Sequence, residues 1–118
     1  MDKRVQILKS KYRWYEGTAL VLIEANGKCV YCGENLMDTR LGYSSMVMDH
    51  LLPKAIYPVV EYDYRNHVLS CVSCNSMKGN YDLLEGGENP DNMLNNREIL
   101  VRRCIDYLQP KIDSRKLE

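Results

Sequence analysis

Residues 48–53 (Met-Asp-His-Leu-Leu-Pro) place a carboxylate and an imidazole side by side within a short apolar run. Two cysteine pairs bracket this run, namely Cys29 with Cys32 and Cys71 with Cys74. Two C-x2-C pairs are typical of a tetrahedral zinc site, because Zn²⁺ prefers thiolate ligands and imposes no geometry of its own. The segment between the pairs is about twice as long as the roughly 15–20 residues of an ordinary four-cysteine zinc ribbon. A ribbon does not need that much chain, so the segment should carry something more.

Polar residues follow in a distinctive order: Asp49-His50, then Asn66, then the second cysteine pair, and finally Asn75 and Lys78. The series C-x2-C, Asp-His-x-x-Pro, Asn, C-x2-C and Asn-x-x-Lys resembles the zinc-containing branch of the HNH endonucleases, over the stretch from Cys29 to Gly79. This resemblance implies an α+β fold. It would be a small ββα-metal (HNH) unit stapled by a four-cysteine zinc site and flanked by N- and C-terminal helices.

The composition is that of a globular protein without net charge. The 118 residues are 45% hydrophobic and 27% charged, with 16 basic and 16 acidic side chains. Zero net charge argues against binding nucleic acid through bulk electrostatics, and leaves only local basic patches near the two ends. We interpret the acidic stretch over residues 82–91 as a solvated face. No apolar run is long enough to cross a membrane, and the N-terminus lacks a signal-like core, so we expect a cytoplasmic protein with reduced thiols. The resemblance implies that it is bacterial or phage-encoded.

A chain of 118 residues should form one domain over residues 1–118. The apolar pattern predicts a helical part (1–28) and a C-terminal helix (95–109), and the resemblance implies a zinc and ββα core (29–79) between them. Helical spacing over 3–15 should be interrupted at Gly17. A second helix should run from a cap at Thr18 to Gly27. Strands are predicted at 46–50 and around Val68, followed by a helix from Val72 to Gly79. Asn95 should cap the last helix in a capping box with Glu98, and Pro110 should break it.

The Asp-His run carries the candidate chemistry. Asp49 offers a carboxylate and Asn75 a carbonyl oxygen, ligands that suit Mg²⁺ or Mn²⁺ better than zinc. His50 titrates near neutral pH and can take a proton from water. The resemblance implies that His50 is the general base, Asp49 a metal ligand, Asn66 the residue that fixes the histidine loop, and Asn75 the last motif position. Candidate phosphate contacts are Lys54, Lys78, Arg102 and Arg103.

Each of these residues also has a structural interpretation. His50 could be a buried histidine bonded to a backbone carbonyl, Asp49 could cap a turn, and Lys78 could be a solvated helix lysine. For Tyr31 and His67 we favour packing.

We therefore expect a metal-dependent endonuclease that hydrolyses phosphodiester bonds in DNA, most simply double-stranded, acting as a homodimer or with a partner protein when both strands are cut. The alternative is a non-catalytic zinc module that binds nucleic acid or protein. A redox role for the cysteine pairs is a more distant third.

Overall fold

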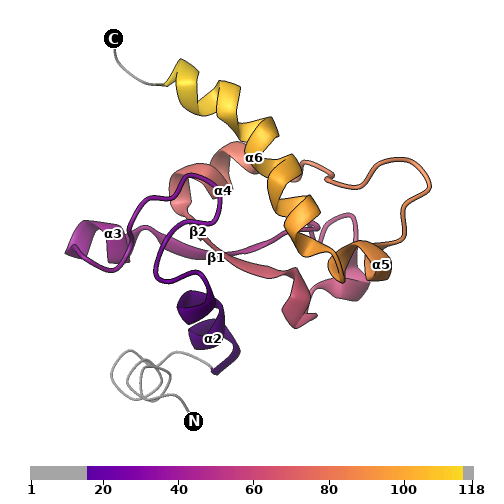
Figure 1. Ribbon diagram of the computed structural model, residues 1–118, viewed down its shortest axis with the longest axis horizontal. Coiled ribbons are helices and arrows are strands. Elements are labelled where there is room, and N and C mark those ends of the chain that lie inside the picture. Colours follow the sequence, from indigo (N-terminus) through magenta and orange to yellow (C-terminus); the bar gives the residue numbers. More distant parts are fainter. Residues whose placement is uncertain (1–15, 116–118) are drawn as a thin grey trace.

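A two-stranded antiparallel sheet lies at the centre of the computed structural model, which describes residues 16–115, with side chains from residue 20 onward (Figure 1). β1 (Met46–His50) pairs with β2 (His67–Cys71), and the register sets His50 opposite His67. The chain continues from β2 directly into α4 (Val72–Lys78). The two strands and this helix form the ββα unit expected from the sequence, and the α+β fold class is confirmed.

Helices cover this ribbon on two sides. α2 (Glu16–Glu24) contacts β2, whereas α4 contacts both strands and also α6 (Arg97–Ser114). In Figure 1, α4 and α6 lie above the strands and α2 lies below them. Shorter elements occupy the connections: α3 (Arg40–Ser44), η1 (Pro58–Val60), η2 (Tyr64–Asn66) and α5 (Pro90–Leu94).

The core joins the cysteine cluster to the leucines of the C-terminal helix. Its fully enclosed side chains include Leu51 and Leu52 after β1, Leu100, Cys104 and Leu108 on α6, and Leu36, Leu83 and Leu94 from the connections. Burial of each leucine contributes roughly 1.5–3 kcal/mol relative to exposure. Because Leu51 and Leu52 directly follow His50, packing of the core anchors the chain at the predicted site.

The N-terminal boundary differs from the prediction. Gly17 and Thr18 both lie within α2, so the predicted break and cap are wrong. The C-terminal end also comes earlier than predicted: α2 ends at Glu24, and both Asn26 (φ +54°) and Gly27 (φ +70°) have the left-handed conformation expected of Gly27 alone. The predicted helix over residues 3–15 and its basic side chains lie outside the described residues.

The C-terminal helix also departs from its prediction. Asn95 ends α5 instead of capping α6, because its side chain accepts a hydrogen bond from Arg65. Asn96 takes the cap position of α6 without a side-chain bond. α6 continues through Pro110 to Ser114, and the packing of Ile112 against the core offsets the backbone hydrogen bond that proline removes. No helix in the stretch from residue 16 to 115 is long and apolar enough to span a membrane.

Candidate metal centre and active site

The four cysteines of the two C-x2-C pairs converge on one point. Their Sγ atoms all lie within 4.8 Å of one another, and those of Cys32 and Cys71 are 3.9 Å apart. Tetrahedral zinc with Zn–S bonds of about 2.3 Å sets its sulfurs roughly 3.8 Å apart, so the cluster fits this ion. A backbone hydrogen bond of 2.9 Å from Val30 to Leu69 docks the first pair against β2. Cys71 ends β2 and Cys74 lies in α4, so a bound ion would tie both parts of the ββα unit together.

The close thiols of the cluster shift one another's pKa. The Cys74 thiol lowers the pKa of Cys29 to about 4 by hydrogen bonding, and the same bond raises the pKa of Cys74. Burial raises the pKa of Cys32 to about 11. The pKa shifts thus favour a thiolate at Cys29 and oppose one at Cys32 and Cys74, so a bound dication would be needed to deprotonate these two thiols.

A separate surface pocket of about 240 Å³ lies at the end of β1 and the face of α4. It brings together five of the residues expected at the site, together with part of the turn that ends α4: its lining is Asp49, His50, Pro53, Lys54, Asn75, Lys78, Gly79 and Asn80. Neighbouring residues on a strand point to opposite faces, so Asp49 and His50 share one pocket only because β1 ends at His50. Carboxylate and amide oxygens at one pocket suit a hard dication such as Mg²⁺ or Mn²⁺.

His50 is held through one ring nitrogen. Its Nε2 atom lies 3.0 Å from the carbonyl oxygen of Glu61. Because a carbonyl can only accept, Nε2 must carry the proton, and Nδ1 is then the basic nitrogen of the neutral ring. Burial first, and then the nearby His67, lower the pKa of His50, which favours the neutral form. The bonded histidine of the structural interpretation and a proton-accepting histidine are therefore compatible with the same geometry.

Asn66 closes the loop that follows His50. Its side chain is fully buried and makes three hydrogen bonds to backbone: Leu52 N–H donates to its Oδ1 at 2.7 Å, and its Nδ2 donates to the carbonyls of Leu52 and Val60 at 3.0 and 3.2 Å. The backbone of Asn66 also accepts from Leu51 N–H at 2.9 Å. These bonds fix both ends of the segment that presents His50 and Glu61.

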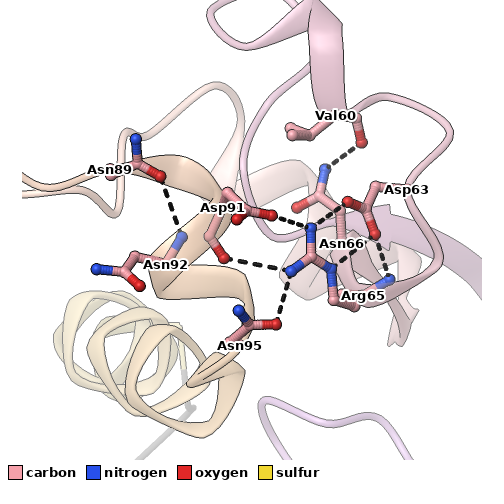
Figure 2. A network of polar contacts seen from close by, with 8 residues as sticks. All are labelled: Val60, Asp63, Arg65, Asn66, Asn89, Asp91, Asn92 and Asn95. Atoms are coloured by element: carbon pink, nitrogen blue, oxygen red, sulfur yellow. Dashed lines mark hydrogen bonds and ion pairs between the residues drawn. The ribbon is translucent and has the colours of Figure 1, made fainter.

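Arg65, next to Asn66, ties this loop to α5 (Figure 2). Its guanidinium donates to both carboxylate oxygens of Asp63, at 3.1 and 2.6 Å, and to Asp91 Oδ1 at 2.7 Å. The remaining donors reach Asn95 Oδ1 at 2.7 Å and the Asp91 carbonyl at 3.3 Å. All five N–H groups of the guanidinium have acceptors, so Arg65 fixes the position of Asn66 relative to the C-terminal helices.

Asp49 is buried and has two partners. The hydroxyl of Tyr31 donates to its Oδ2 atom at 2.5 Å, and the ammonium of Lys78 lies 3.3 Å from the same oxygen. Lys78 also donates to the carbonyl of His50 at 2.8 Å, and its side chain is only 1% exposed. Lys78 is therefore not the solvated helix lysine considered from the sequence.

The remaining candidate phosphate contacts differ in their surroundings. The Lys54 side chain is 65% exposed at the rim of the pocket and lies 3.9 Å from Glu61. Arg102 is exposed on α6. Arg103 pairs with Glu88 at 2.6 Å and Glu85 at 3.6 Å, so part of the acidic stretch interpreted as a solvated face neutralises it.

Sequence reasoning missed three contributors to this site. Tyr31 bonds Asp49, His67 shares the Glu61 carbonyl with His50 at 2.8 Å, and Arg65 buttresses Asn66. Of these three residues, only Tyr31 carried a signal in the sequence, because it lies between Cys29 and Cys32 of the first cysteine pair. The other two contacts depend on tertiary packing.

Comparison with known proteins agrees with this geometry. The HNH endonuclease family model matches residues 29–81, the segment that carries both cysteine pairs and the pocket. The Septu protein PtuB of Bacillus thuringiensis is 44% identical over 64 residues, which are 53% of this chain and 24% of that protein. The match thus spans about a quarter of the length of that relative.

Proposed function

We propose, from the premise that residues 29–81 belong to the HNH endonuclease family, that this chain hydrolyses phosphodiester bonds in DNA with His50 as the general base. The observation that carries the proposal is the hydrogen bond from His50 Nε2 to the Glu61 carbonyl. It leaves Nδ1 as the basic nitrogen of a histidine that lines the same pocket as Asp49 and Asn75.

The residues divide the work as follows. His50 Nδ1 takes a proton from the attacking water, and Asn66 and Glu61 keep the ring in position for that transfer. Asp49 and Asn75 would hold a Mg²⁺ or Mn²⁺ ion, which when bound stabilises the negative charge that grows on the phosphate. Lys54 and Arg102 are exposed cations that can contact neighbouring phosphates, whereas Lys78 and Arg103 would need to leave carboxylate partners to do so.

The wider organisation is part of the same proposal. We propose that residues 1–118 form one domain, in which a helical N-terminal part (1–28) precedes the core (29–79) and α6 (Arg97–Ser114) packs on α4. One such site cuts one strand, so cleavage of both strands would need a second copy or a partner protein. Double-stranded DNA as the substrate and a cytoplasmic location complete the proposal.

A non-catalytic zinc module remains the second candidate. The observation in its favour is the pairing of Asp49 with Lys78, which neutralises the carboxylate in the absence of any ligand. Such a module would bind nucleic acid or protein and leave the substrate intact.

A plasmid-nicking assay on zinc-loaded protein separates the two. We expect nicking with added Mg²⁺ or Mn²⁺ and none without, and His50→Ala should reduce it by about 10²–10⁴-fold with unchanged zinc content and melting temperature. The metal-free arm should omit the dication instead of adding a chelator, because a chelator would also strip zinc. Full activity in folded His50→Ala would exclude His50 as the base, and absence of nicking in the wild type with either dication would favour the binding module.

A further inference from the structure

The two oxygens of Asp49 have different surroundings. Oδ2 receives the Tyr31 hydroxyl and the Lys78 ammonium, while Oδ1 has no protein partner within the described part of the chain. Among the same residues, no buried side-chain oxygen or nitrogen lacks a hydrogen bond. Oδ1 must therefore reach solvent, and the opening that Asp49 lines is the pocket shared with His50 and Asn75.

Lys78 is placed as a counter-ion. Its ammonium lies on Asp49 Oδ2 and on the His50 carbonyl, and Asp49 is its one carboxylate partner among residues 20–115. A buried charge is tolerated when it is paired and hydrogen-bonded, and each member of this pair meets that condition through the other. The Asp49–Lys78 pair is consequently neutral before any ligand enters.

We propose that Lys78 is a permanent counter-ion of Asp49 that keeps the affinity of the pocket for a divalent cation low, while Lys78 and Tyr31 together commit Oδ2 to the protein and leave Oδ1 for the ion. The assignment rests on the proposed function for the role of the ion in cleavage, and it adds a residue that sets how the ion is held. A weakly held ion depends on oxygens from the substrate phosphate to complete its coordination.

The charge of Lys78 has a measurable effect. A unit positive charge one carboxylate away from a dication opposes binding by roughly tenfold, even at the dielectric constant of water. Lys78→Met removes this charge with little change in the shape of the side chain. We therefore expect Lys78→Met to bind Mn²⁺ about tenfold more tightly than the wild type.

The test is a titration of zinc-loaded protein with Mn²⁺ in the absence of DNA, read by the electron paramagnetic resonance signal of free Mn²⁺. Mn²⁺ is a hard ion and does not compete well for the four thiolates. Lys54→Met is the matched control: it removes the same charge from the same pocket, but its ammonium is solvated, so we expect less than about a threefold change. Tyr31→Phe removes the other donor to Oδ2 without changing the charge, and it should also shift the affinity by less than about threefold. Unchanged or weaker Mn²⁺ binding by Lys78→Met would overturn the proposal.

A second measurement covers the outcome in which Lys78→Met folds poorly. The pairing predicts that Lys78→Met is less stable in Mn²⁺-free buffer than the double variant Lys78→Met with Asp49→Asn, since the second change removes the charge left without a partner. Added Mn²⁺ should raise the melting temperature of the single variant more than that of the wild type, and should not affect the double variant. A double variant no more stable than Lys78→Met, or one still stabilised by Mn²⁺, would contradict the assignment.

These readouts are separate from those of the proposed function. Tighter Mn²⁺ binding by Lys78→Met in a protein that never nicks DNA would support the counter-ion and refute the nuclease. A wild type that nicks DNA, together with an unchanged Mn²⁺ affinity in Lys78→Met, would support the nuclease and refute the counter-ion.

Discussion

His50 and His67 face each other across the β1–β2 pair and donate to the same acceptor, the carbonyl oxygen of Glu61, at 3.0 and 2.8 Å. Their rings meet edge to face, with centroids 5.2 Å apart and planes at 87°. A carbonyl oxygen has two lone pairs and can serve both rings. The candidate base is therefore positioned by a second histidine that lies outside the motif.

This pairing predicts a change in the pH dependence of cleavage. His50 must be neutral to accept a proton, so the rate should rise with pH through its pKa. Burial lowers that pKa, and His67 lowers it further. His67→Phe keeps an aromatic ring against His50 but removes the charge, so the pKa should rise and the rising limb of kcat against pH should move to higher pH. A limb that stays in place or moves to lower pH would show that His67 does not act on His50 electrostatically.

Asn66 should matter more for stability than an ordinary asparagine. Asn66→Ala leaves one N–H and two carbonyls of the buried loop without partners, which should cost about 2–4 kcal/mol in the free energy of unfolding. Asn35 also makes three hydrogen bonds, but it is exposed, so Asn35→Ala should cost less than about 1 kcal/mol because water replaces them. Urea denaturation of the two variants compares them directly, and equal losses would mean that the loop is not held by Asn66.

Zinc should be required for folding. Metal analysis should return about one zinc per chain, and Cys71→Ala should lose both zinc and cooperative unfolding. Cys104→Ala is the control, because Cys104 is just as buried but lies outside the cluster, and this variant should stay folded with its zinc. A protein that stays folded but zinc-free after chelation would show that zinc is not required for folding.

DNA binding should distinguish solvated cations from paired ones. Lys54→Gln should make the negative slope of log K against log salt shallower by about one, as expected for loss of one phosphate contact. Arg103→Gln should leave the slope unchanged, because Glu88 and Glu85 already neutralise that guanidinium. Fluorescence anisotropy at several salt concentrations measures both slopes, and the opposite ranking would mean that Arg103 exchanges its carboxylates for phosphate.

Features that depend on local spacing could be predicted from the sequence. The C-x2-C pairs place two thiols on each short turn, so the cluster follows once the pairs meet. The helix from Val72 to Gly79 was also predictable, because glycine readily takes the left-handed conformation that ends a helix. In the structure Gly79 has a φ of +54° and follows the last residue of α4. The shared pocket of Asp49, His50 and Asn75 was expected from the motif order, and the structure brings these side chains together.

Features that depend on distant partners could not be predicted. The side chain of Asn95 accepts a hydrogen bond from Arg65 instead of capping α6. The two residues are 30 apart in sequence, so no local pattern indicates this contact. Pro110 lies inside α6 because core packing outweighs its backbone penalty. The burial of Lys78 similarly depends on Asp49, a residue on a different element.

The loop between Leu52 and Val60 is tied at its base by Asn66, and its middle is exposed, with Val59 89% accessible to solvent. When the two ends of a loop are fixed, lengthening its exposed part costs little entropy, about 0.6 kcal/mol for each doubling of length. Glycine or serine residues added between Pro58 and Val59, which are both exposed, should therefore leave the imidazole of His50 in place. This loop is consequently a place where new recognition segments could be grafted beside the pocket of Asp49, His50 and Asn75 without disturbing its side chains.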